Sequence, residues 1–300
     1  MIKFIKRQLL YNKVKFKNTN QFSNIKKKTN RVVLIEFNSF QILHIIFAYL
    51  SNFFKDKKNL TIKAFYSHIL LSYPFKRTLK QKIFSYIGEI FNFNIFGIYK
   101  SFGVEEFIYP KATDKSKKLS KKHYNRILKI IKNKKDILKI RIESILLGDL
   151  IYDAYLTRNK KQKPTISIND KDFREFLFEF ISLFFAWKDV FKKNRIETLI
   201  VSHSCYTMGI PVRLALSNRK TLALEVKENR LKRLDSSNLH HYSETKIYPS
   251  IFKKFNKKHK KECLKSADFN LKKRFEGSTL DLPYVTNSAF KKNNKKEKNI

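Results

Sequence analysis

Residues 195–219, "RIETLIVSHSCYTMGIPVRLALSNR", decide the fold that we expect for this chain. The opening "RIETLIVS" is short, apolar and β-branched, which predicts a buried strand. A polar turn follows, and "GIPVRLALSNR" favours a helix, because Pro211 is tolerated in a first turn without loss of a helical hydrogen bond. Strand, turn and helix in this order form the unit from which mainly parallel sheets are built.

The same alternation recurs on both sides of that stretch. Strands are predicted by "RVVLIEF" (31–37), "NLTIKAFYS" (59–67) and "KTLALEV" (220–226). Helical spacing of apolar residues marks "FQILHIIFAYLSNFF" (40–54) and "RTLKQKIFSYIGEIF" (77–91). We therefore expect an α/β fold, Rossmann-like, with a mainly parallel sheet and flanking helices.

The remaining segments fill in this picture. Residues 94–110 suggest two short extended pieces around Gly103, and 120–133 an amphipathic helix. Residues 169–194 predict a long helix that is apolar on nearly every side and hence buried, capped by Asn169 or Asp170. We expect one domain over 31–290, a basic, loosely ordered lead-in over 1–30, and a disordered Lys-rich tail over 291–300.

The net charge of +40 is extreme, and lysine outnumbers arginine 52 to 13. Such charge attracts polyanions and anionic lipid surfaces, although a coding bias that over-uses lysine explains it as well. Planar phosphate reading favours arginine, and no nucleic-acid motif accompanies the lysine runs, so specific nucleic-acid binding is not expected. Two cysteines, no signal peptide and no convincing bilayer span predict a cytoplasmic protein, with contact at the inner membrane face left open.

Candidate ligand contacts lie just after two of the predicted strands, because open parallel sheets bind ligands beyond the carboxyl ends of their strands. They are Glu36, Asn38 and Ser39 after the first strand, and Ser202, His203 and Ser204 after the late one. His203 has a side chain suited to a general base or to a hydrogen bond with a phosphate or sugar hydroxyl; a purely structural histidine is the alternative. Tyr206, Thr207 and Gly209 then open a helix whose N–H groups attract anions.

A second candidate set lies in "GDLIYDAYLTR" (148–158). Asp149 and Asp153 are four residues apart, which puts both carboxylates on one helix face, with Arg158 nearby. Paired carboxylates suit acid–base work or metal binding, whereas a partner for the helix N-terminal dipole on a solvated face is the alternative. Nowhere do histidines and acids follow a zinc-binding spacing, so no metal is expected.

Four stretches resemble the amino-terminal half of bacterial capsule and surface-polysaccharide biosynthesis proteins of glycosyltransferase type. They are "ILLGDLIYDAYLTR" (145–158), "KPTISINDKDF" (163–173), "LIVSHSCYTMGIPVRLAL" (199–216) and "RFEGSTLDLPYVTNSAF" (274–290). The most specific is the Ser202–His203 motif that runs through Gly209 to Arg213. The resemblance implies a GT-B-like enzyme, with two Rossmann-like domains that face a cleft.

In that family the amino-terminal domain mostly receives the acceptor and the other domain mostly holds a nucleotide-sugar donor. The resemblance therefore implies that His203 or Glu36 deprotonates an acceptor hydroxyl, and that Arg213 and the other polar residues named above contact a sugar or lipid-linked glycan. Since this chain ends where the second domain should begin, we expect no cofactor in it; the complete enzyme would take its nucleotide-sugar donor from a second domain or a partner chain. A non-enzymatic basic module that binds an anionic polymer or membrane, and an inactive truncated remnant, stay open as alternatives.

Overall fold

A computed structural model describes residues 2–22, 29–38, 41–66, 79–158, 165–218, 220–227, 230–239 and 247–277. The chain divides into two units, Met1–His241 and Tyr242–Ile300. The second unit contributes the helices α10 (Tyr248–Lys254) and α11 (Lys257–Phe275). The expected domain over 31–290 spans both units, and the expected tail over 291–300 lies outside the described residues.

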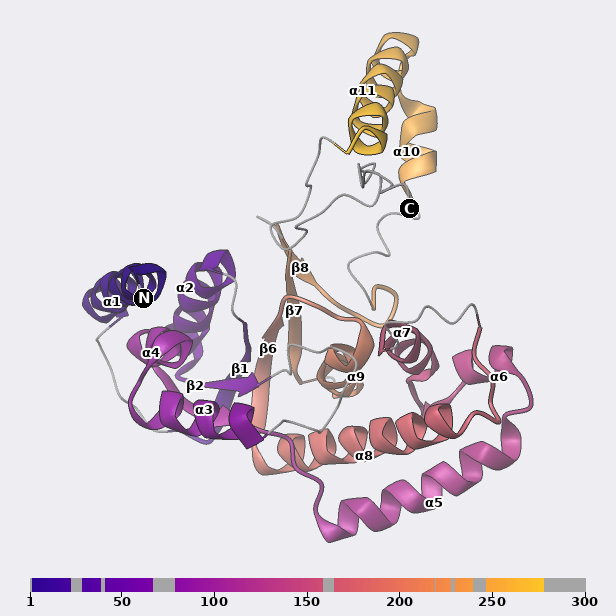
Figure 1. Cartoon of the computed structure of the whole chain (residues 1–300), viewed down its shortest axis with the longest axis horizontal. Helices are drawn as coiled ribbons and strands as arrows, with labels where there is room; N and C mark the ends of the chain where they lie inside the picture. Colours follow the sequence, from indigo (N-terminus) through magenta and orange to yellow (C-terminus); the bar gives the residue numbers. More distant parts are fainter. Residues whose placement is uncertain are drawn as a thin grey trace, which may run out of the picture. The chain divides into compact units, whose positions relative to one another are not determined.

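The first unit is built around a six-stranded sheet (Figure 1). Its strands, from one edge to the other, are β3 (Val104–Ile108), β2 (Thr61–Tyr66), β1 (Arg31–Phe37), β6 (Arg195–Val201), β7 (Leu222–Lys227) and β8 (Arg230–Arg233). Every neighbouring pair is parallel except β7 and β8. The α/β class and the mostly parallel sheet are therefore confirmed.

Helices cover both faces of the sheet, and β1 shows why its sequence is apolar throughout (Figure 1). Successive side chains of a strand point to opposite faces. Val33 and Ile35 pack with α2 (Gln41–Lys58) and α4 (Asn94–Ser101), whereas Val32 and Leu34 belong to the core on the other face. A strand that is buried on both faces has no polar side to expose.

The second face of the sheet is covered mainly by α8 (Lys171–Lys193), with α9 (Gly209–Ser217) and α7 (Gly148–Arg158) on the same core. Asp170 caps α8, since its carboxylate accepts a hydrogen bond from the Asp172 amide, as one of the two predicted caps. Helix α5 (Asp114–Ile130) packs on the far side of α8, so the all-round apolar surface of α8 is buried as predicted. Short elements join α5 to α7: α6 (Lys134–Leu138), β4 (Arg141–Ile142) and β5 (Ile145–Leu146).

Two segments differ from what the sequence suggests. Only the second part of 94–110 is extended, as β3; the first part forms α4, because Ile98, Tyr99 and Phe102 are spaced to bury one helical face. Gly103, with φ of 100°, then takes the left-handed conformation that ends the helix. Residues 2–22 form the helix α1 (Ile2–Phe22), which packs against α4.

The helix α3 (Leu79–Ile90) precedes α4 and leaves several apolar side chains exposed, including Ile83 and Tyr86. None of the helices in the described part of the chain combines the length and the apolarity needed to cross a bilayer.

Candidate functional site

The predicted contacts after β1 and β6 come together at the centre of the sheet. In the sheet, the strands that follow β1 in the chain, β2 and β3, lie on one side of it, and the strands that follow β6, β7 and β8, lie on the opposite side. β1 and β6 therefore flank the point where the strand order reverses. In open α/β sheets, ligands bind beyond the carboxyl ends of the strands at such a point. Glu36 is the penultimate residue of β1, and the loop after β6 carries Ser202, His203 and Ser204.

Glu36 is 2 % exposed and its carboxylate is held by three hydrogen bonds. Oε2 accepts from the Ser202 amide at 2.6 Å and from Ser202 Oγ at 2.8 Å. Oε1 accepts from Asn38 Nδ2 at 2.7 Å. All three donors are neutral, and no lysine or arginine of the described chain lies within ion-pair distance. Glu36 is thus a buried carboxylate without a compensating cation, and its hydrogen bonds connect it to Ser202 and Asn38.

His203 completes this cluster and is partly exposed. Its Nδ1 lies 2.8 Å from Ser202 Oγ. Because the single hydroxyl proton of Ser202 is donated to Glu36, we assign the proton between Ser202 and His203 to Nδ1. The neutral ring then carries no proton on Nε2, which has no hydrogen-bond partner in the described part of the chain. His203, Ser202 and Glu36 therefore form a relay that leaves one basic nitrogen accessible.

A second buried carboxylate, that of Glu225 on β7, lies at the same edge of the sheet. Ser204 Oγ is 3.0 Å from each of its carboxylate oxygens. The neighbouring Cys205 thiol is affected: burial first, and then the negative charge of Glu225, raises its pKa to about 12. Two buried carboxylates, those of Glu36 and Glu225, thus accept hydrogen bonds from serines of the loop after β6, in a chain with a net charge of +40.

The loop after β1 is fixed by two residues that the sequence reasoning missed. The Asn38 amide donates to Tyr99 Oη at 2.9 Å, and that hydroxyl donates to the Glu36 carbonyl, also at 2.9 Å. The Asn38 carbonyl accepts from His44 Nε2 at 2.6 Å. Burial raises the pKa of Tyr99 well above its ordinary value and lowers that of His44.

No local pattern marked Tyr99, since its role depends on α4 docking beside β1. The sequence did contain a signal for Glu225, because Glu225, like Glu36, is an acidic residue near the end of an apolar strand.

The turn into α9 is organised by packing. Tyr206 and Thr207 form the short 3₁₀ helix η1 (Tyr206–Met208), and Tyr206 has φ of 52°, which is uncommon for a residue with a side chain. A Cβ on Gly209 would lie 2.6 Å from both the Leu150 side chain and the Ser204 carbonyl oxygen. The absence of a side chain at Gly209 therefore allows α7 to pack closely against this turn.

The residues of the second candidate set, on α7, lie in different environments. Arg213 is 3 % exposed and its Nη2 lies 2.5 Å from Asp149 Oδ2, while Nη1 donates to the Leu146 carbonyl at 3.2 Å. This ion pair between a buried arginine and a half-buried aspartate ties α9 to α7. Asp153 is exposed on α7 and raises the pKa of Cys205 slightly, so it lies toward the same loop. The side chain of Arg158 and the whole of Ser39 lie outside the described residues.

Within the described residues, no group of three or more His, Cys, Asp and Glu side chains is arranged to hold a metal ion. Comparisons with protein-family models, with curated proteins and with solved structures gave no match. The chemistry of the carboxyl edge is therefore inferred from its own residues.

Proposed function

We propose that the carboxyl edge of the sheet binds a hydroxyl-bearing ligand, and that this chain is the acceptor-binding half of a GT-B-like sugar transferase of surface polysaccharide biosynthesis. The observation that carries the proposal is the His203–Ser202–Glu36 relay, which leaves Nε2 of His203 as a base at the position where α/β sheets bind ligands. The resemblance of 145–173 and 199–216 to capsule proteins supports the choice of a sugar.

In the proposed reaction, His203 Nε2 takes the proton of an acceptor hydroxyl while the hydroxyl oxygen attacks the anomeric carbon of the donor sugar. The bond from that carbon to the nucleotide diphosphate breaks, and the diphosphate leaves with the bonding electrons. Protonated His203 carries a positive charge, which the Glu36 carboxylate stabilises through Ser202. Glu36 is buried and already accepts three hydrogen bonds, so His203 is the better placed of the two predicted bases.

The donor is expected to be a nucleotide sugar held by a second Rossmann-like domain or partner chain. A lipid-linked glycan suits the acceptor role, since basic surface near a membrane would favour a phosphate-bearing molecule. The resemblance implies a nucleotide-sugar donor. Transfer would then occur on the cytoplasmic side of the membrane.

The first test is ligand binding by the chain alone. We expect a panel of oligosaccharides, screened by saturation-transfer NMR, to contain binders whose signals disappear in Ser202→Ala and persist in Ser202→Thr, which keeps the hydroxyl. His123→Ala is the matched control, because His123 is a partly exposed histidine on α5, on the far side of α8. Absence of any sugar binder would contradict the proposal.

The second test is transfer, measured with the partner chain or by complementation. His203→Ala should lose at least about a hundredfold in rate, in line with removal of a general base, with little change in melting temperature. Ser202→Thr should keep the activity that Ser202→Ala loses. A fully active His203→Ala variant of unchanged stability would show that the relay is structural.

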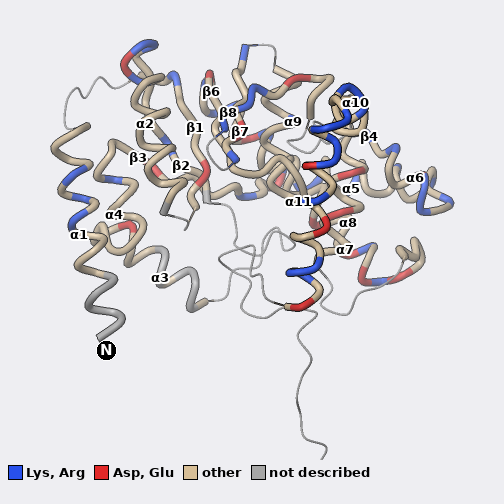
Figure 2. Tube along the Cα trace, turned by 90° about the horizontal axis from the view of Figure 1, so that it is seen from above, with Lys and Arg blue, Asp and Glu red and all other residues tan. Residues whose placement is uncertain are grey.

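A second candidate function, a basic module for an anionic polymer or membrane surface, is favoured by the second unit. No described residue of α10 or α11 is buried, and lysines and arginines recur along α11 (Figure 2). Binding of this kind weakens steeply with added salt, whereas sugar binding at the carboxyl edge should not. Charge reversal at Lys265 and Lys272 of α11 should reduce polyanion binding and leave the sugar test unchanged.

A further inference from the structure

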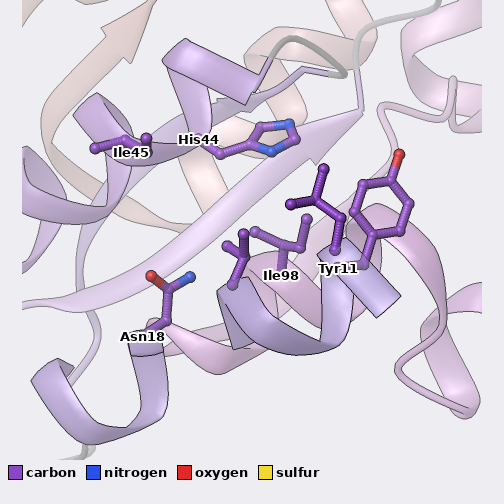
Figure 3. Close-up of a pocket in the computed structure, with 7 residues that line it drawn as sticks. Tyr11, Asn18, His44, Ile45 and Ile98 are labelled. Atoms are coloured by element: carbon purple, nitrogen blue, oxygen red, sulfur yellow. The ribbon is translucent and has the colours of Figure 1, made fainter. Parts of the chain in front are cut away.

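A cavity lies where α1 passes α2 and α4, and one of its lining residues, His44, also holds the Asn38 loop of the candidate site (Figure 3). Its volume is about 30 Å³, enough for one water molecule. It adjoins an open groove of about 610 Å³ between α1 and α2, and the two share Leu10, Val14, Asn18 and Ile45 as lining residues. The groove is as large as many small-molecule sites.

His44 stands at the inner end of this space. Figure 3 shows its ring, on α2, facing the side chains of Tyr11 from α1 and Ile98 from α4. Nε2 must carry the ring proton because it donates to the Asn38 carbonyl, so Nδ1 is an acceptor. Within the described chain Nδ1 has no partner, although His44 is only 3 % exposed. A buried acceptor left unsatisfied is costly, and one water molecule in the cavity would satisfy it.

The wall and the rim of the groove differ in character. Leu10, Ile45 and Tyr49 line it and are 46 %, 50 % and 57 % exposed. Apolar surface that gathers in a groove in this way is typical of a binding site. Lys13 and Lys17, one turn apart on α1, line the same groove and are exposed.

We propose that the α1–α2 groove binds a single-chain anionic amphiphile, such as a fatty acid or a monoalkyl phosphate. The apolar chain lies against Leu10, Ile45 and Tyr49, and the anionic group meets Lys13 and Lys17. The complementary charge favours an acid or phosphate over a neutral lipid. This site is independent of the proposed sugar transfer, although Asn38, which His44 holds, also contacts Glu36 and Ser202.

The test is calorimetric titration of the full chain with dodecanoate and with dodecyl phosphate below their micelle concentrations, with dodecanol as the neutral probe. Ile45→Glu should weaken binding of the anionic probes by about tenfold or more, since it places a carboxylate against the chain. Ile42→Glu is the matched control, because Ile42 lies on the same helix, is 53 % exposed and lines neither space.

A second pair of variants tests the charge. Lys13→Glu with Lys17→Glu should remove the preference for the anionic probes over dodecanol. The same reversal at Lys118 and Lys122 of α5, which have the same spacing and are also exposed, should leave it in place.

Equal weakening by the two isoleucine variants, or by the two lysine pairs, would overturn the proposal in favour of general adsorption to a basic protein. Binding to phosphatidylglycerol vesicles without binding of the single-chain probes would overturn it in favour of a bilayer surface.

Discussion

The two ends of the central strand pair, β1 and β6, each hold a glutamate side chain, but with different partners. Each end has a glutamate of one strand in contact with the other strand. At the amino end, Arg31 Nε and Nη2 donate to the two oxygens of Glu197 at 2.6 and 2.7 Å, and the arginine lowers the Glu197 pKa. At the carboxyl end, Glu36 receives only neutral donors.

The difference shows where this fold keeps an uncompensated charge. At the amino end the negative charge is cancelled in place by a cation, so the contact joins the strands and leaves little field. At the carboxyl end the charge remains and is transmitted through Ser202 to His203, and together with Glu225 it contributes to the raised pKa of Cys205. In a protein with 65 basic residues, the carboxylate of Glu36 thus remains uncompensated beside a histidine.

The largest expected effect is that of Glu36→Ala. It leaves two buried donors of Ser202 and a part-buried donor of Asn38 without their charged acceptor, so we expect a loss of about 4 kcal/mol in the free energy of unfolding, measured by urea denaturation. Glu197→Ala, at the opposite end of the same strand pair, should cost much less. If Glu36→Ala does not fold, Glu36→Gln provides the comparison; equal losses at the two ends would break the contrast.

Thiol reactivity measures the environment of the carboxyl edge more directly. Because burial and nearby carboxylates raise the pKa of Cys205 to about 12, little thiolate forms near neutrality. At mildly alkaline pH we expect Cys205 to react with an alkylating reagent at least about a hundredfold more slowly than an ordinary thiol. Mass spectrometry of labelled peptides checks this, with Cys263 on α11 as the internal reference. Rapid labelling of Cys205 in the folded chain would contradict this environment.

His44 should make stability depend on pH. Burial lowers its pKa in the folded state, so on acidification the unfolded chain takes up the proton first and stability falls from about pH 7 downward, until the folded ring also titrates. His44→Gln keeps a donor for the Asn38 carbonyl and should flatten this dependence in urea unfolding at a series of pH values. A residual slope is expected from His123, whose pKa burial also lowers. An unchanged slope would show that His44 is not the source.

The smallest effect is expected at the amino end. Arg31→Ala removes a partly exposed ion pair, so the loss of stability should be small and should shrink further at high salt. Because the Glu197 pKa is lowered in the folded state, the contribution of the pair is present above the ordinary glutamate pKa and is lost as the pH falls through the folded value. A large loss of stability that does not depend on salt would show that the amino end is as important for stability as the carboxyl end.

The fold was largely predictable, because its signals are local. The strands at 31–37, 195–201 and 222–227 are short apolar runs, and α8 begins after a predicted cap. The first part of 94–110 was not, because its apolar residues fit either a strand or a helix, and only the packing of Tyr99 and Phe102 decides. The strand β8 was not predicted, since its residues "RLKR" have no apolar run.

The sequence by itself determined that Asn38, Ser202 and His203 follow strands and that Glu36 lies near the end of one, because strand ends can be read from apolar runs and the polar residues after them. Only the tertiary structure decided that β1 and β6 are neighbours, and hence that Glu36 accepts from Ser202 across 166 positions of chain. It also decided that Arg213 pairs with Asp149 inside the protein and that Glu225 joins the carboxyl edge. Strand order depends on the packing of both faces of the sheet at once, which no local pattern contains.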